Sequence, residues 1–204
     1  MLAALVPAGA AAEPLTLLAF GDSLTAGYGL PPEEGFVQQL QGWLAEHGAE
    51  VTVLNGGVSG DTTAGGLARI DWALTPEVDA MIVTLGGNDL LRGLPPEEAR
   101  ANLDAILDRA DERQLPVLLV PMTAPGNYGP DYKDAFDAIY PELAKEHGAR
   151  LAPPFLSPIL AQEDRAAAIA AYIQPDGLHP NAEGVALVVE GLGPEVLDML
   201  DSAE

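Results

Sequence analysis

The sequence contains no cysteine, which excludes disulfide bonds, thiolate metal ligands and a cysteine nucleophile. Positive charge is also scarce, with 9 lysines and arginines against 31 aspartates and glutamates and a formal charge of −22. Such a surface repels nucleic acid and anionic membrane faces, so we expect neither as a partner. The acidic residues are scattered along the chain, and we interpret them as a solubilising surface.

Long apolar runs and phosphate-binding patterns are missing as well. Outside the N-terminus, no stretch approaches the ~20 apolar residues that a membrane-spanning helix needs, so we expect no integral membrane segment in the mature chain. Neither GxxxxGK[ST] nor GxGxxG occurs, which disfavours a nucleotide-binding loop. With three histidines and no cysteine, the sequence offers no convincing cluster of metal ligands.

The chain has 204 residues, of which 48% are hydrophobic, and this predicts one globular domain over residues 13–204. Residues 1–12, MLAALVPAGAAA, resemble the end of a secretory signal, although the positively charged start of such a signal is missing. We therefore predict a signal-peptide remnant and a periplasmic or secreted protein. A disordered or helical N-terminal extension is the alternative.

Short apolar runs alternate with helical patterns along the chain. The runs typical of buried strands are Leu15–Phe20, Val51–Leu54, Ala80–Leu85, Leu115–Val120 and a short Arg150–Ala152. Apolar residues at helical spacing predict helices at Phe36–Leu44, Thr63–Ala73, Ala99–Ala110, Tyr132–His147 and Ala182–Leu200. This alternation predicts an α/β fold of three layers, with about five parallel strands in a flavodoxin-like order and helices on both faces.

Ligands of such sheets bind beyond the carboxyl ends of the strands, where this sequence places several polar side chains. Ser23 follows the first strand, Gly60 the second and Asn88 the third. Each tip alone is also explained as ordinary turn chemistry. Together they have the parts of an acyl-transfer site, which needs a nucleophile, a base, an orienting acid and donors for an oxyanion.

The base is found by elimination among the three histidines. His47 and His147 each precede a glycine at a predicted helix end, where the helix dipole accounts for them. His179 remains, and Asp176 lies three residues before it, close enough on one loop to fix its tautomer. The alternative is that His179 belongs to the start of the last helix, with Asn181 as its N-cap.

The roles of the other candidate site residues are inferred from their positions directly after predicted strands. Ser23 projects from the sheet edge as a nucleophile, but it is equally explained as an N-cap. Asn88 follows two glycines, which permit close approach of the backbone to a ligand, and its amide is a candidate oxyanion donor. Gly60 offers a backbone N–H for the same purpose.

These blocks resemble those of the GDSL (SGNH) hydrolase family. Gly21-Asp22-Ser23-Leu24 matches the motif that names it, and the family's Ser, Gly, Asn and His fall in order on Ser23, Gly60, Asn88 and His179. The resemblance extends from Leu15 to about Met199. The stretch from Gly86 to Gly93 and Asn127-Tyr128-Gly129 look most similar to the bacterial thioesterase I/lysophospholipase/arylesterase subgroup, whose members are usually periplasmic.

The resemblance implies a flavodoxin-like SGNH hydrolase fold and a serine esterase or thioesterase that hydrolyses a small-molecule acyl ester or thioester through an acyl-enzyme. It implies a triad of Ser23, His179 and Asp176, with the N–H groups of Ser23 and Gly60 and the amide of Asn88 as oxyanion donors. It implies no metal and no organic cofactor. By the same analogy, residues 92–96 and 123–131 would border the acyl pocket.

Two other functions stay open. The same fold serves carbohydrate O-deacetylases, which exposed aromatic side chains around the site would favour, although aromatics are only 5% of this sequence. A non-enzymatic flavodoxin-like binding module is the second alternative, and it predicts that catalytic groups are missing. The sequence leaves the natural substrate and the oligomeric state undetermined.

Overall fold

A five-stranded parallel sheet forms the centre of the computed structural model, which describes residues 14–202. Its strands are β1 (Leu15–Gly21), β2 (Val51–Gly57), β3 (Ala80–Thr84), β4 (Val117–Leu119) and β5 (Arg150–Leu151). They lie in the order β2-β1-β3-β4-β5. This is the flavodoxin-like order, so the predicted fold class is confirmed.

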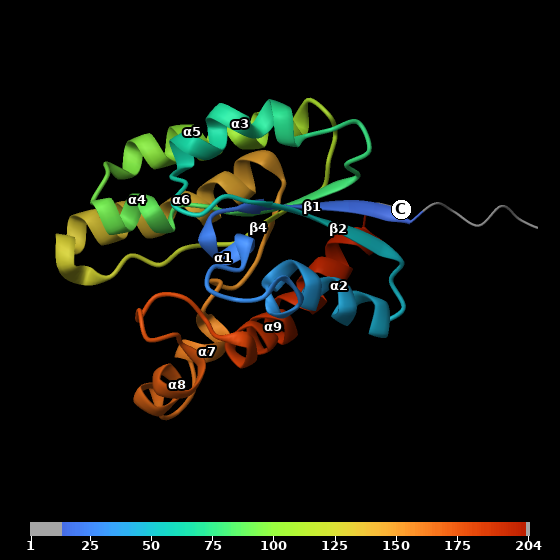
Figure 1. The fold of residues 1–204 in the computed structure, drawn as a ribbon. Helices are drawn as coiled ribbons and strands as arrows, with labels where there is room; N and C mark the ends of the chain where they lie inside the picture. Colours follow the sequence, from blue (N-terminus) through green and yellow to red (C-terminus); the bar gives the residue numbers. More distant parts are fainter. Residues whose placement is uncertain (1–13, 203–204) are drawn as a thin grey trace, which may run out of the picture.

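Helices cover both faces of the sheet (Figure 1). The α-helices are α1 (Ser23–Ala26), α2 (Phe36–Glu46), α3 (Thr63–Ala73), α4 (Gly87–Arg92), α5 (Pro96–Asp111), α6 (Pro130–His147), α7 (Ser157–Leu160), α8 (Arg165–Tyr172) and α9 (Ala182–Asp201). Helices α3, α5 and α6 pack together on one face, while α2 and α9 pack together on the other (Figure 1). The result is the predicted three-layer arrangement.

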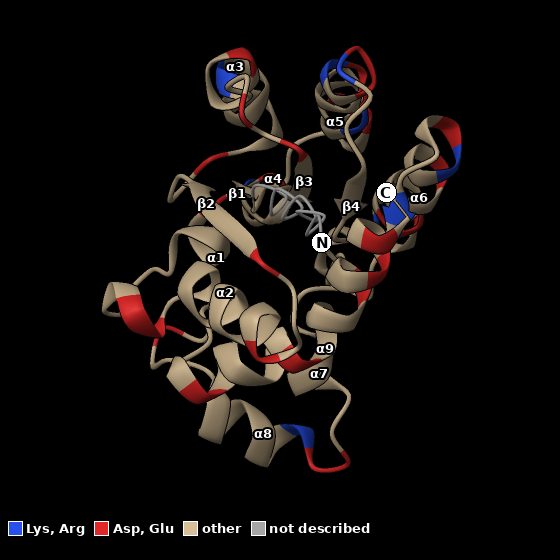
Figure 2. Cartoon of the chain, turned by 90° about the vertical axis from the view of Figure 1, so that its right-hand side faces the viewer, with Lys and Arg blue, Asp and Glu red and all other residues tan. Residues whose placement is uncertain are grey.

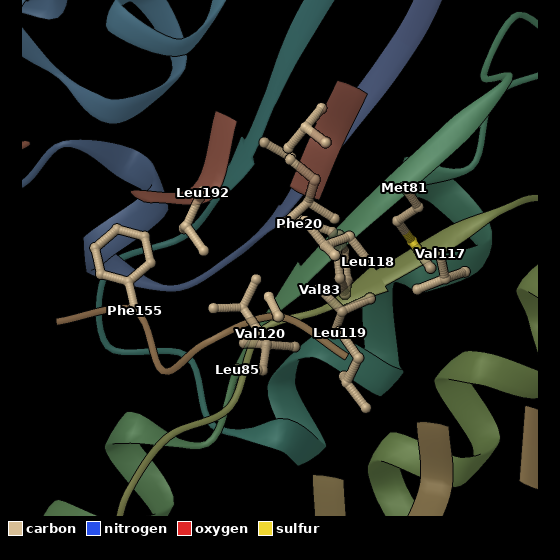
Figure 3. Close-up of a cluster of buried hydrophobic side chains, with 14 of the residues drawn as sticks. Phe20, Met81, Val83, Leu85, Val117, Leu118, Leu119, Val120, Phe155 and Leu192 are labelled. Atoms are coloured by element: carbon tan, nitrogen blue, oxygen red, sulfur yellow. The ribbon is translucent and has the colours of Figure 1, made fainter. Parts of the chain in front are cut away.

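The strands are buried because their sequences are continuously apolar. Every residue of β3 is buried, as are the last five of β1. Side chains of β1, β3 and β4 belong to one buried cluster that also contains Phe155, which precedes α7, and Leu192 of α9 (Figure 3). Parallel strands that are covered on both faces require this composition, which is why the apolar runs located them in the sequence.

Element ends differ from the predictions in two ways. Strand β2 continues through Gly57, although the sequence predicts a polar tip from Asn55 onward. Strand β4 is shorter than the predicted run, and Pro116, which has no N–H to donate, lies outside it. The short helices α1, α4, α7 and α8 were not predicted, because segments of four to eight residues carry little helical periodicity.

Acidic side chains are spread over helices on both sides of the sheet, with few basic ones among them (Figure 2). No helix in the described part of the chain has the length and hydropathy to cross a membrane. The predicted signal-peptide remnant, residues 1–12, lies outside the described residues.

Candidate active site

Ser23, Asn88 and His179 come together at the carboxyl ends of the central strands. Ser23 begins α1 directly after β1, Asn88 lies in α4 after β3, and His179 lies in the loop before α9. All three line one cavity of about 340 Å³. The sequence prediction that these separate tips meet at one edge of the sheet therefore agrees with the structure.

A chain of two hydrogen bonds joins the predicted triad. His179 Nε2 lies 2.8 Å from Ser23 Oγ, and His179 Nδ1 lies 2.6 Å from Asp176 Oδ2. The other oxygen of Asp176 accepts the backbone N–H groups of Leu178 at 2.9 Å and of His179 at 3.1 Å. The carboxylate thus orients both the loop and the imidazole ring.

Asp176 is held in its ionised form. The N–H of Leu178, the His179 ring and the His179 N–H all donate to it and lower its pKa to about 2. An ionised acceptor at Nδ1 favours the tautomer that carries its proton there, which leaves the Nε2 lone pair directed at Ser23 Oγ. This is the arrangement by which a histidine removes a proton from a serine hydroxyl.

Neither Ser23 nor His179 is the N-cap of the helix that follows it. Asp22, not Ser23, is the N-cap of α1, and its side chain accepts the N–H of Leu24 at 3.0 Å. Asn181 caps α9 through the N–H of Gly184 at 2.9 Å, as that alternative supposed, but His179 lies before the cap with its ring against Ser23 and Tyr28.

The two glycines before Asn88 allow α4 to begin inside the site. Gly86 has a φ of 115°, and a Cβ there would lie 2.2 Å from the Tyr140 hydroxyl. A Cβ on Gly87 would lie 3.1 Å from Asp22 Oδ2. The chain therefore turns tightly past Asp22, and Asn88 Nδ2 donates to the same carboxylate oxygen at 3.3 Å.

Gly60 is placed less directly. It has a φ of 85°, and its carbonyl accepts a hydrogen bond of 2.8 Å from Arg92 at the end of α4. Gly60 is not among the residues that line the cavity of Ser23 and His179. The role of its N–H as an oxyanion donor stays a prediction.

Sequence reasoning missed the two buried aspartates beside the named residues. Asp22 and Asp89 are 2% and 1% exposed. Asp89 accepts both the backbone N–H and the hydroxyl of Thr63, at 2.9 and 2.7 Å, and so joins α4 to the start of α3. Their positions next to Ser23 and Asn88 were the available signal.

The apolar space around the site is larger than the first cavity. A second cavity of about 380 Å³ lies beside it. The residues that line both cavities are Leu90, Met122, Thr123 and Leu156. Residues 123–131 border the site as expected, through Thr123, Pro125, Asn127 and Tyr128. Residues 92–96 do not line it, and Leu90 and Leu91 of α4 take that place.

His47 and His147 lie at helix ends, as predicted: His47 is the C-cap of α2 and His147 the last residue of α6. Among the described residues, potential metal-ligand atoms of Asp108, Asp111 and His147 fall within 4.8 Å of one another. Both His147 nitrogens, however, already bond to carboxylates of Asp104 and Asp111. The geometry there is that of a hydrogen-bonded helix contact.

The sequence pattern described as the GDSL-like Lipase/Acylhydrolase family matches residues 19–187 of this chain. The arylesterase of Vibrio mimicus is 37% identical over 185 residues, covering 90% of this chain and 89% of that protein. The thioesterase 1/protease 1/lysophospholipase of Escherichia coli (strain K12) is 33% identical over 188 residues, covering 91% and 85%. The crystal structure of AlinE4, an SGNH-hydrolase family esterase, is 45% identical with a TM-score of 0.74, covering 94% and 99%.

Proposed function

This chain belongs to the GDSL-like lipase/acylhydrolase (SGNH) family and is a carboxylic ester hydrolase, and we propose that it cleaves carboxylic esters and acyl thioesters through an acyl-enzyme on Ser23. The observation that carries this proposal is the 2.8 Å contact between His179 Nε2 and Ser23 Oγ, with Asp176 behind the ring. The names of the relatives, an arylesterase and a thioesterase, support the same two substrate classes.

The proposed reaction has two steps. His179 takes the hydroxyl proton while Ser23 Oγ attacks the acyl carbonyl carbon, and the negative charge passes to the carbonyl oxygen. The carbon–oxygen or carbon–sulfur bond then breaks, and His179 returns the proton to the departing alkoxide or thiolate. A water molecule then attacks the carbonyl carbon of the acyl-enzyme while His179 takes its proton. The bond between the acyl carbon and Ser23 Oγ breaks, His179 returns the proton to Ser23 Oγ, and the carboxylic acid is released.

The N–H groups of Ser23 and Gly60 and the amide of Asn88 are the proposed donors to the transient oxyanion. Such donors act where charge develops, and removing one from a comparable site lowers kcat by about 10²–10³-fold. In this chain, Asn88 lines the cavity beside Ser23. Gly60 is tied to the same helix as Asn88 through Arg92.

The adjoining cavities favour an acyl group of medium length. Beyond Ser23 the shared wall is largely apolar, and the second cavity continues past Leu156 to Leu160. Each buried methylene contributes about 0.8 kcal/mol, so a chain that reaches the second cavity gains binding over acetyl. We propose that the acyl chain runs from Ser23 across Met122 and Leu156 into that second space.

One observation keeps carbohydrate O-deacetylation as a second candidate. Tyr28 and Tyr128 are exposed aromatic side chains at the site, with Tyr28 packed against the His179 ring and Tyr128 lining the cavity. Sugars stack on such rings. The binding-module alternative predicts missing catalytic groups, whereas Ser23, His179 and Asp176 are all joined here by hydrogen bonds.

The first test is hydrolysis of p-nitrophenyl esters from acetyl to dodecanoyl, together with acyl-CoA and acetylated sugars. We expect Ser23→Ala to lower kcat by at least about 10³-fold on every substrate that the wild type cleaves, because the nucleophile is removed. Ser202→Ala is the matched control, since Ser202 only bonds carbonyls in the last turn of α9. Unchanged turnover by Ser23→Ala would refute the proposal. An optimum on acetylated sugars would favour the deacetylase.

A second test concerns the path of the acyl chain. Leu156→Trp fills the junction of the two cavities, so we expect octanoyl and longer esters to lose on the order of 10-fold or more in kcat/KM while acetyl ester hydrolysis is retained. Leu160→Trp, which fills only the second cavity, should affect the longest chains alone. A chain-length profile that is identical in wild type and Leu156→Trp would show that the chain takes another route.

A further inference from the structure

Asp22 is buried between the proposed nucleophile and the proposed oxyanion donor. Its side chain is joined to both neighbouring elements, because Oδ1 accepts the N–H of Leu24 in α1 and Oδ2 accepts Asn88 Nδ2 in α4. The proposed reaction gives this carboxylate no part in proton transfer. A buried carboxylate is nevertheless costly, since burial disfavours its charge.

The amide of Asn88 has two faces of opposite polarity. Its nitrogen carries two hydrogens and its oxygen only accepts, so a rotation of 180° about the last side-chain bond exchanges donor for acceptor. An oxyanion next to the amide oxygen would be repelled, whereas one next to the amide nitrogen is stabilised. Catalysis therefore requires one of the two rotations to be fixed before the substrate arrives.

We propose that Asp22 is a positioning residue that fixes this rotation: its Oδ2 accepts one Asn88 Nδ2 hydrogen and leaves the other directed at the oxyanion. The inference rests on the proposed function of Ser23 and Asn88 and deepens it. A carboxylate oxygen only accepts, so it holds the nitrogen face of the amide and rejects the oxygen face. A neutral amide in its place, with its oxygen toward the N–H of Leu24, would turn an NH₂ group toward Asn88 and favour the opposite rotation.

The surroundings of Asp22 leave this contact little freedom. Gly87 passes so close that a Cβ there would lie 3.1 Å from Oδ2. The α4 backbone that carries Asn88 is held in turn by Asp89, through its two hydrogen bonds to Thr63. Asp89 thus fixes where the backbone of Asn88 lies, and Asp22 fixes how its side chain is turned.

The ionisation of Asp22 gives the arrangement a pH dependence. Burial raises the pKa of Asp22 to about 6, although the N–H of Leu24, the nearby His179 and the Asn88 amide all lower it. The titratable groups that face it are His179, Asp89 and Tyr140. Because the carboxylate is the better acceptor, the hold on Asn88 should weaken as the pH falls through about 6.

The test is a double-mutant cycle with Asp22→Asn, Asn88→Ala and the double variant. Asp22→Asn keeps an oxygen to accept the N–H of Leu24 but turns an NH₂ group toward Asn88, so the amide of Asn88 should rotate to accept from it. We expect kcat to fall by about 10²-fold with KM changed less than about 3-fold, because a donor to the oxyanion is lost. In the Asn88→Ala background, the same change should lower kcat by less than about 3-fold.

Two outcomes would overturn the inference: Asp22→Asn with kcat within about 3-fold of wild type, or an equal loss in both backgrounds, which would mean that Asp22 acts without Asn88. Circular dichroism checks the fold of each variant. Should Asp22→Asn not fold, Asp22→Ser keeps a cap for Leu24 without reaching Asn88 and should show the same loss.

The pH dependence of kcat/KM distinguishes a positioning role of Asp22 from a merely structural one, because a structural role would not alter the shape of the profile. Below pH 6, log kcat/KM of the wild type should fall more steeply than that of Asp22→Asn, because only the wild type protonates Asp22 there. Parallel profiles would count against the inference. The Ser23→Ala comparison is independent of the double-mutant cycle. If Ser23→Ala abolishes ester hydrolysis, the proposed function holds whatever the Asp22 variants do. If Ser23→Ala leaves ester hydrolysis intact, both the proposed function and the inference on Asp22 are refuted.

Discussion

His179 and His147 have similar hydrogen-bond partners but differ in their suitability for proton transfer. His179 has Asp176 at Nδ1, 2.6 Å away, and the Ser23 hydroxyl at Nε2, 2.8 Å away. His147 has Asp111 at Nδ1, 2.7 Å away, and Asp104 at Nε2, 2.9 Å away. The two sites share a carboxylate at the first nitrogen and differ in what lies at the second.

The partner at the second nitrogen decides whether the ring can exchange a proton. A hydroxyl group can donate to the unprotonated Nε2 of a neutral imidazole and can accept from the protonated Nε2 of an imidazolium. The Ser23 hydroxyl is therefore compatible with both protonation states of His179, as proton transfer within one reaction requires. Two carboxylates both require a donor, and they are satisfied only by the doubly protonated ring. His147 is thereby suited to hold α5 and α6 together rather than to move protons.

The most severe test of this difference replaces the carboxylate that both rings share. In Asp176→Asn, an amide NH₂ meets Nδ1, which then has to accept, so the proton moves to Nε2 and the lone pair facing Ser23 is lost. We expect kcat on p-nitrophenyl esters to fall by about 10⁴-fold, with the fold retained because an amide oxygen still accepts the Leu178 and His179 N–H groups.

Asp111→Asn is the matched control, since it makes the same change at Nδ1 of the other histidine. It should leave kcat within about 2-fold of wild type and affect stability alone. Normal turnover by Asp176→Asn would assign the orienting role to another acid. A large loss of kcat in Asp111→Asn would show that the two histidines are not as separate as their partners indicate.

The sequence predicts the surroundings of His179 better than those of His147. Elimination among three histidines and the three-residue spacing to Asp176 favoured His179 as the candidate base over a helix-start residue. The contact between His179 and Asp176 was predictable because both residues lie on one loop. The carboxylates around His147 come from α5, 36 and 43 residues away along the chain. A contact between two helices depends on how they pack, which periodicity within each helix does not specify.

In the fold too, features set by local sequence were predictable and contacts between distant segments were not. Buried parallel strands leave continuous apolar runs, so their number and their alternation with helices were readable. Right-handed crossovers favoured a doubly wound fold, and about five strands fitted a flavodoxin-like order, which the family resemblance also implied. The capping role of Asp22 was not readable, because Gly21-Asp22-Ser23 permits either Asp22 or Ser23 as the N-cap of α1. Asp89 was missed because its partner, Thr63, lies 26 residues away on another helix.

The smaller test concerns His147 and stability. His147→Gln removes the charged ring between α5 and α6, so we expect a lower free energy of unfolding with kcat unchanged. Asp104 and Asp111 are 41% and 49% exposed, and solvent screening should limit the loss to roughly 1 kcal/mol. Urea unfolding of both proteins at pH 5.5 and at pH 8.5 measures it.

The pH dependence of that loss separates a charged clamp from a merely well-packed ring. Burial lowers the pKa of His147, but hydrogen bonds and charges from Asp104 and Asp111 outweigh it, so the pKa in the folded protein is raised. A raised pKa contributes stability that is complete below the unfolded value of about 6.5 and is lost as the pH rises through the folded value. The difference between wild type and His147→Gln should therefore be larger at pH 5.5 than at pH 8.5. If the difference in unfolding free energy were the same at the two pH values, the charge of His147 would contribute nothing, and packing alone would hold α5 and α6 together there. His147 and His179 would then differ only in the geometry of their hydrogen bonds.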